Sequence, residues 1–291
     1  MKKTFIVLML FCYTFFISIL LFAGPGMHGF KTIANGNFVL NEYTTLSANA
    51  MAGANTIFVA NSGLNVNMRF PGNLLAGELL LIIQMQGATI NTTDTNSVNW
   101  GTLTNLNNAG NFELIEVVAV PNSTTIQLAT PLMNSYTVSG KVQVIRVPRY
   151  TQFVLDSTGS VTSVPWDGST GGVVVLEVDQ DAILRGLIDV TAKGFRGGVI
   201  DSISDNPGNH LKYSSKLKGA GAEKGEGIAG GAILFDLAGG RYGRGAAANG
   251  GGGGNSHNCG GGGGANGSNG LTWNGQGIPD TIGGLPINRW A

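Results

Sequence analysis

The stretch GGGGGNSHNCGGGGG, residues 250–264, constrains this chain most, because it places ten glycines around one histidine and one cysteine. The glycines are concentrated in one region, since 30 of the 47 lie between Gly194 and Gly284. A flexible linker contains glycine and serine with nothing to bury. Here the run AILFDLAG, which starts at Ala232, carries apolar side chains that need a covered face. The region is therefore expected to be ordered.

Glycine runs can order as extended left-handed helices with three residues per turn, whose backbone groups point outward. Hydrogen bonds between such helices, each worth about 0.5–1.5 kcal/mol net, would offset the backbone entropy that glycine loses. We expect a bundle of polyglycine-type helices, with GGAILFDLAGG as a supporting strand. The structural glycine tract in this prediction consists of Gly250, Gly251, Gly252, Gly253, Gly254, Asn255, His257, Asn258, Gly260, Gly261, Gly262, Gly263 and Gly264.

His257 and Cys259 raise the question of a metal site. A structural zinc site needs four ligands and a catalytic one usually three, and no second ligand pair stands at metal spacing. In an extended segment His257 and Cys259 could lie on one face, so a metal site stays open as an alternative. The favoured interpretation is that Asn255, His257 and Asn258 hydrogen-bond to glycine backbones. A Cys–His nucleophile would also need an orienting group and an oxyanion site, and the sequence indicates neither.

Two further binding motifs are weak. Gly225, Gly227 and Gly230 fit G-x-G-x-x-G, but a polar segment precedes them and a strand-like run follows, whereas the dinucleotide fingerprint needs a strand and then a helix. Oxygen-rich loops can hold calcium, and acidic pairs occur at 179/181 and 201/205, without EF-hand spacing. Solvated turns are favoured there. No catalytic, cofactor-binding or metal residue is assigned, and calcium is the one cofactor kept as an alternative.

The first 23 residues are predicted to be a secretory signal peptide. Lys2 and Lys3 precede an apolar run from Phe5 to Phe22, and Ala23 is a small residue at a plausible cleavage point. Membrane contact is expected only through this segment before cleavage, with a retained anchor as the alternative. The formal net charge is zero, with 17 basic and 17 acidic residues, which argues against nucleic acid as a partner.

Residues 24–150 are predicted to form an all-β domain, a β-sandwich or a barrel-like structure. NFELIEVVAV (111–120) and TTIQL (124–128) are separated by PNS and predict a hairpin. KVQVIRVPRY (141–150) closes the segment, and Pro148 should end its central pairing. The polar stretch 89–110 is expected to be a long loop, and long loops on β scaffolds are either functional or mobile.

Residues 151–193 are predicted to be a connecting segment of short strands, which suits a solenoid or a stacked sheet. Residues 194–291 form the glycine-rich domain. Tryptophans in loops with amide neighbours suit carbohydrate stacking, so Trp100 and Trp273 are candidate surface-contact residues. For Trp100 the favoured interpretation is a loop anchor that packs on the domain edge, and edge packing is also favoured for Trp166.

The order VIRVPRY, VPWDGSTGGVVVLEV, GLIDVTAKGFRGG and GGGGGNSHNCGGGGGANGSNG resembles the N-terminal region of giant cell-surface adhesins of the Bacteroidota, most of all the gliding-motility adhesins. The resemblance spans about residues 70–270. It implies export by the type IX secretion machinery, although no C-terminal sorting domain is visible in the sequence.

Together these features predict a non-enzymatic, exported adhesin at the cell surface, or the N-terminal fragment of one. Its expected partners are polysaccharide or a solid surface. Two alternatives stay open, a phage-type tail-fibre tip adhesin and a β-solenoid polysaccharide-degrading enzyme. Acidic and basic residues clustered in one groove would favour the enzyme.

Overall fold

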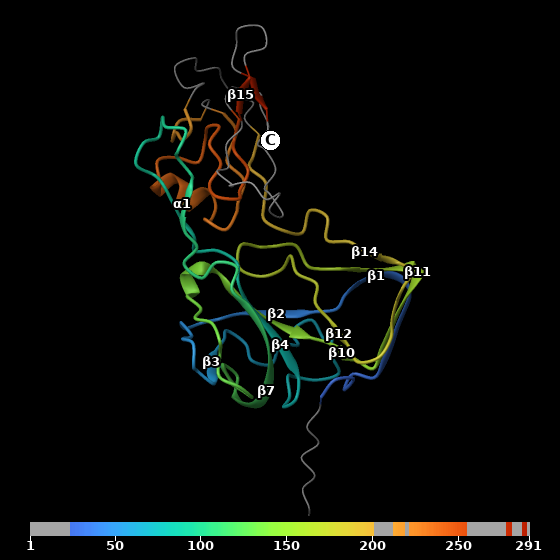
Figure 1. The fold of residues 1–291 in the computed structure, drawn as a ribbon. Coiled ribbons are helices and arrows are strands. Elements are labelled where there is room, and N and C mark those ends of the chain that lie inside the picture. The colour runs from blue at the N-terminus through green and yellow to red at the C-terminus, as the bar shows by residue number, and fades with distance from the viewer. Residues whose placement is uncertain (1–23, 201–211, 219–220, 255–277, 281–286, 290–291) are drawn as a thin grey trace, which may run out of the picture.

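The computed structural model describes residues 24–200, 212–218, 221–254, 278–280 and 287–289. Strands dominate this part of the chain, and its one α-helix has six residues, so the all-β prediction is confirmed. The sandwich or barrel arrangement of residues 24–150 stays a prediction. The described strands fall into a six-stranded antiparallel sheet, a stack of parallel strands and three strand pairs (Figure 1).

The antiparallel sheet has the strand order β2-β9-β4-β7-β8-β3. Its strands are β2 (Glu42–Thr45), β3 (Thr56–Phe58), β4 (Leu79–Gln84), β7 (Phe112–Asn122), β8 (Thr125–Leu128) and β9 (Val142–Val147). β7 and β8 form the predicted hairpin, with Asn122 paired to Thr125 across the turn. Pro148 ends β9 as predicted, and β9 lies between β2 and β4 in the sheet.

The central strand β4 is apolar at consecutive positions because both of its faces are covered. On one face, Leu80 and Ile82 belong to the main hydrophobic core of the sheet. On the other face, Leu79 and Leu81 lie in a second cluster, against which residues of the segment 173–175 pack. A strand covered on both faces carries a continuous apolar run, not an alternating one, as in LLLII.

A second group of strands runs parallel. β1 (Phe30–Val39), β11 (Gln152–Thr162), β13 (Ala182–Leu184) and β14 (Leu187–Ile188) form this parallel stack, and β10 (Arg149–Tyr150) pairs in parallel with β12 (Glu177–Val178). β1 precedes the six-stranded sheet in the sequence and pairs with β11, which follows it. The stack therefore joins residues on both sides of the expected boundary at 150.

The segment GGVVVLEV lies between the sheet and the stack and serves both. Val173 and Val175 pack against the sheet, while Val174, Leu176 and Val178 pack against the core of the stack. Its backbone is held at alternate residues by side chains from β9, β2 and the residue before β2. The side-chain amides of Gln143 and Asn41 each bond to both the N–H and the carbonyl of one residue, Gly171 and Val175 respectively. The Tyr43 hydroxyl donates to the Val173 carbonyl. Side-chain amides and a phenol thus replace a neighbouring strand.

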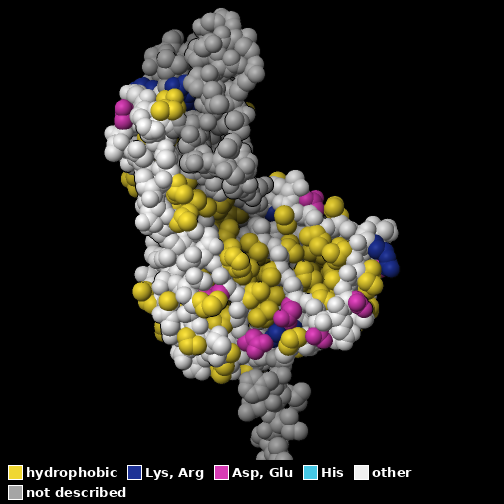
Figure 2. Space-filling model, viewed as in Figure 1, with side chains coloured by type: hydrophobic (Ala, Val, Ile, Leu, Met, Phe, Trp, Pro, Cys, Tyr) yellow, Lys and Arg dark blue, Asp and Glu magenta, His cyan; other side chains and the backbone are white. Residues whose placement is uncertain are grey.

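The last strands of the stack leave apolar side chains uncovered. Leu155 and Val161 of β11 are 0% exposed, but their partners Leu184 and Ile188 on the next strands are 55% and 42% exposed. Hydrophobic side chains gather on this side of the molecule, between the glycine-rich part and the six-stranded sheet (Figure 2). Within the described residues, no further strand pairs with β13 or β14.

The described residues from 194 to 254 form the glycine module, which packs mainly through its backbone. The N–H groups of residues 223, 224 and 225 donate to three different neighbouring segments. The N–H group of residue 226 donates to the same segment as that of residue 223. Their acceptors are, in order, the carbonyls of Val199, Arg241, Gly251 and Arg196. The first and fourth N–H groups are thus three residues apart, and so are their acceptors Val199 and Arg196. A side chain at Gly198 or Gly253 would overlap a neighbouring carbonyl.

A lysine ammonium group lies at the centre of the glycine module. Lys224 is buried, and its Nζ donates to the carbonyls of Tyr213 (2.6 Å), Gly243 (2.8 Å) and Gly245. The same Nζ lies 4.5 Å from the centroid of the Trp100 ring. Desolvation by burial lowers the pKa of Lys224 well below its usual value. Three carbonyls satisfy the three ammonium protons. The side chain therefore ties its own segment to Tyr213 and to the segment of Gly243 and Gly245.

The run expected to be a supporting strand is a helix. α1 (Ala232–Leu237) is one short turn between glycine pairs, with Phe235 N–H bonded to the Gly231 carbonyl at 3.1 Å. Phe235 points into the core of the module, while Ile233 and Leu237 are exposed. Within this turn the Phe235 and Ala238 N–H groups donate to the carbonyls of Gly231 and Leu234, so these groups need no strand partner. The strand prediction for AILFDLAG was therefore wrong.

The remaining strands are short. β5 (Thr89–Ile90) and β6 (Leu103–Asn105) form a hairpin within the polar stretch 89–110, and β15 (Ile278–Asp280) pairs with β16 (Ile287–Arg289). A 3-10 turn, η1 (Val138–Gly140), leads into β9. The hairpin contacts the glycine module through backbone bonds from Tyr213 to Thr95 and from Ala248 to Gly101.

Candidate functional site

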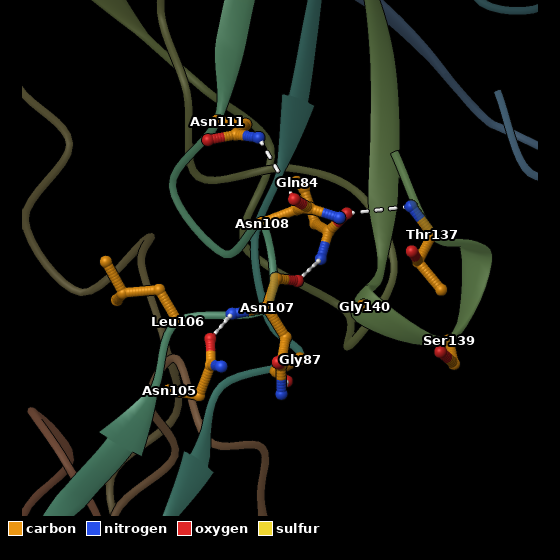
Figure 3. A pocket seen from close by; sticks show the side chains of 10 residues that line it. All are labelled: Gln84, Gly87, Asn105, Leu106, Asn107, Asn108, Asn111, Thr137, Ser139 and Gly140. Carbon is orange, nitrogen blue, oxygen red and sulfur yellow. Dashed lines mark hydrogen bonds between the residues drawn. The ribbon is translucent and has the colours of Figure 1, made fainter. Parts of the chain in front are cut away.

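A polar cleft opens where β4 ends and where β7 and β9 begin. Its volume is about 640 Å³, within the size range of small-molecule sites. The loop after β6 forms one wall and the η1 turn forms the other (Figure 3). We call it the asparagine cleft. Its described lining residues are Gln84, Gly87, Asn105, Leu106, Asn107, Asn108, Asn111, Thr137, Ser139 and Gly140.

Gln84 fixes both walls of the asparagine cleft. Its side chain is buried, its Oε1 accepts the Thr137 N–H at 2.8 Å, and its Nε2 donates to the Asn107 carbonyl at 3.0 Å (Figure 3). A Cβ at Gly140 would overlap this amide, so glycine is required at that position. One buried amide therefore holds the η1 turn and the asparagine loop at a set separation.

The asparagine loop has an unusual backbone. Asn107 and Asn108 both have left-handed conformations, with φ of 46° and 70°. Asparagine tolerates this region better than most residues, but two in succession are costly and such conformations cluster at binding sites. The Asn105 Oδ1 accepts the Asn107 N–H at 2.9 Å, and the Asn107 Nδ2 donates to the Gly87 carbonyl at 3.1 Å. These bonds hold the loop in place.

The asparagine cleft offers uncharged hydrogen-bonding groups to solvent. Among the described residues, the Ser139 hydroxyl and the side-chain nitrogens of Asn105 and Asn108 make no hydrogen bond. No described lining residue carries a charge, and Leu106, half exposed, adds an apolar contact. Hydroxyls and amides can both donate and accept, so the cleft suits a ligand rich in hydroxyl or amide groups.

The buried acids lie elsewhere and are internally satisfied. Glu78 pairs with Arg146, and Glu42 accepts two bonds from Asn67. Glu113 accepts the Tyr136 hydroxyl at 2.8 Å, and burial together with this bond raises the pKa of Tyr136. These carboxylates hold loops and strands together, and none of them lines the asparagine cleft.

Trp100 is not a surface-contact residue, and that prediction was wrong. Its side chain is 0% exposed and its Nε1 donates to the Ala238 carbonyl at 3.0 Å. It packs in a cluster with Tyr213 and Phe235 of the glycine module. The hairpin carries the ring into the module because small residues there, including Gly245, leave space for an indole. The favoured interpretation, a packing anchor, describes Trp100 correctly.

The other predicted residues divide between the described and undescribed parts of the chain. Gly250, Gly251, Gly252 and Gly253 are buried in the glycine module, and Gly254 lies at its described end. Trp166 is buried and contacts Phe195 edge to face, as favoured. Outside the described residues lie Asn255, His257, Asn258, Cys259, Gly260, Gly261, Gly262, Gly263, Gly264 and Trp273, together with the acidic pair at 201/205.

Within the described residues, no three His, Cys, Asp or Glu side chains come together as metal ligands. The Asp179 N–H bonds to the Tyr150 carbonyl, and the Asp181 carbonyl accepts the Phe153 N–H. Both residues therefore belong to the turn that leads into β13. Over the same part of the chain, no helix has the length and apolar character needed to cross a bilayer.

No family model matches the chain, and no curated protein matches it. Among solved structures, the Gp54 tailspike of Acinetobacter baumannii bacteriophage AP22, in complex with A. baumannii capsular saccharide, is 13% identical over 55% of this chain and 28% of its own, with a TM-score of 0.26.

Two tailspikes of Pseudomonas phages are also similar. For gp61 of phage phi297, the identity is 14% over 57% of this chain and 22% of that one, with a TM-score of 0.25. For gp49 of phage LKA1, the identity is 16% over 48% of this chain and 27% of that one, with a TM-score of 0.20. The chain thus spans roughly a quarter of the length of these three structures. With every TM-score below 0.5, the likenesses carry no argument about fold or ligand.

Proposed function

We propose that the protein is an exported adhesin that binds polysaccharide in the asparagine cleft without cleaving it. The cleft itself carries this proposal, since it combines a suitable volume with amide and hydroxyl groups held by the buried Gln84. Polysaccharides present repeated hydroxyl groups, which such side chains can pair with in both directions. An open cleft also lets a long chain enter and leave.

The lining chemistry supports binding without turnover. Glycoside hydrolases use a pair of carboxylic acids on either side of the scissile bond. No described lining residue of the asparagine cleft is an acid, and the buried glutamates Glu42, Glu78 and Glu113 are engaged in structural bonds. We therefore place binding ahead of the solenoid-enzyme alternative.

The glycine module is proposed to be the stiff platform that presents the cleft. The three-residue hydrogen-bond period of residues 223–226 supports polyglycine-type helices in this module. Because Trp100 and Lys224 connect the module to the hairpin beside the cleft, a rigid module would hold the asparagine loop in place. Amide exchange across residues 221–254 tests this part, because a flexible tether would exchange at once.

Export through a cleaved signal peptide and type IX secretion, and a role in gliding motility, are proposed from the sequence resemblance. An antibody against the protein should label intact gliding cells, and labelling should be lost when the secretion machinery is removed. Labelling that survives that removal would contradict this route.

Binding is tested with purified protein on a panel of immobilised polysaccharides. We expect retention on at least one polysaccharide, loss of retention in the double variant Asn105→Ala with Ser139→Ala, and no new reducing ends. Asn35→Ala, an exposed asparagine on β1, is the matched control. Equal retention of all three proteins would remove the cleft from the proposal. Retention on glass or plastic alone would point to a solid surface, and released sugar would favour the enzyme.

A further inference from the structure

We propose that the asparagine cleft selects an uncharged, N-acetylated sugar residue and excludes acidic sugars. The inference rests on the proposed function, because it names the class of polysaccharide that the same cleft would take. Three features of the cleft lead to it: the absence of charge on its described lining residues, the outward atoms of its asparagine wall, and the position of Leu106.

Charge decides against acidic sugars. A carboxylate moved from water into a site without a cation or enough donors loses solvation that nothing replaces. Lys141 follows the cleft residue Gly140, but its exposed side chain is absent from the lining. A uronate or another acidic sugar would therefore meet only neutral groups in the described part of the cleft.

The asparagine wall offers a donor and an acceptor together. The Asn105 Oδ1 is occupied by the Asn107 N–H, and the Asn107 Nδ2 is occupied by the Gly87 carbonyl. Their outward atoms are therefore a donor, Asn105 Nδ2, and an acceptor, Asn107 Oδ1. An acetamido group carries one C=O and one N–H, which match this pair. A simple hydroxyl sugar has no planar group of that kind.

Leu106 lies between these two asparagines in the sequence and is half exposed at the same wall (Figure 3). It would contact the methyl group of an acetamido substituent, whose burial is favourable. No aromatic side chain occurs among the described lining residues. Since no ring is available for stacking, the amide contacts must supply the selectivity.

The test is isothermal titration of the purified protein with three pentasaccharides: an N-acetylglucosamine oligomer, its glucose counterpart and a galacturonate oligomer. We expect tightest binding of the N-acetylated oligomer, about tenfold weaker binding of the glucose oligomer, and none of the uronate. A tenfold factor corresponds to about 1.4 kcal/mol, which lies within the net range for two amide hydrogen bonds. Equal or tighter binding of the glucose or uronate oligomer would overturn the inference.

Two variants separate charge from shape. Ser139→Lys adds a cation at an exposed lining position, so it should gain measurable uronate binding, whereas Lys141→Gln should leave the order of the three ligands unchanged. A loss of selectivity in Lys141→Gln would also count against the inference. Binding of other polysaccharides but none of these oligomers would refute the inference alone. An absence of binding to every polysaccharide would refute the proposed function with it.

Discussion

Replacement of Trp100 by alanine tests whether this residue anchors the hairpin in the glycine module. The indole is fully buried, its Nε1 bonds to the Ala238 carbonyl at 3.0 Å, and the Lys224 ammonium lies over its ring. Truncation of a buried tryptophan to alanine costs about 3–5 kcal/mol. The Ala238 carbonyl would also lose the indole donor, which adds to the cost when the group stays buried.

Trp100→Phe separates these two contributions, because phenylalanine keeps most of the apolar contact and removes the indole donor. We expect it to lose about 1–3 kcal/mol, the cost of a buried polar group without its partner. Leu103→Ala, on the same hairpin, is the control. Leu103 is 37% exposed, so truncation there should cost about 1–1.5 kcal/mol, clearly less than Trp100→Ala.

Amide hydrogen exchange followed by mass spectrometry is the assay. A loss of 3 kcal/mol or more corresponds to over a hundredfold faster exchange, at 1.4 kcal/mol per tenfold, wherever exchange follows local opening. We expect this acceleration in residues 221–254 of Trp100→Ala and much less in β4 and β9. Unchanged exchange in the module, with loss of polysaccharide binding, would refute the anchor role and restore Trp100 as a contact residue.

Three other perturbations have defined outcomes. Lys224→Met should lower the free energy of unfolding of the glycine module by about 3 kcal/mol, measured by amide exchange, because the Gly245 carbonyl loses its ammonium partner; an unchanged module would show that the ammonium contributes nothing. Leu155→Ala should cost about 2–5 kcal/mol in urea unfolding, and Leu184→Ala clearly less, since it is 55% exposed; equal costs would mean that Leu184 is covered in solution. Burial lowers the pKa of His28, whose Nδ1 accepts the Arg149 N–H at 2.9 Å, so the folded state favours the neutral ring. Stability should therefore fall as the pH drops below about 6.5, the ordinary imidazole pKa. The urea midpoint should fall less with pH in His28→Gln than in the unchanged protein. An equal fall in both proteins would assign the effect to other groups.

The sequence by itself determined the strand content and several individual strands. The hairpin of β7 and β8 follows from alternating apolar residues around PNS, and the end of β9 follows from Pro148, which cannot donate to a sheet. These features depend on near neighbours in the chain. The sequence also indicated the polar stretch 89–110 as a functional or mobile loop, and part of the asparagine cleft lies there.

Only the tertiary structure decided which residues of that stretch face solvent. Trp100 and Asn107 are seven positions apart, yet one is buried in the glycine module and the other lines the asparagine cleft. The pairing of β1 with β11, across more than a hundred residues, is likewise invisible to local pattern. The physical reason is the same in both cases. Burial depends on which distant segment supplies the covering surface. For Trp100 that surface combines the Tyr213 and Phe235 side chains with glycine-module backbone, and backbone has no side-chain pattern to read.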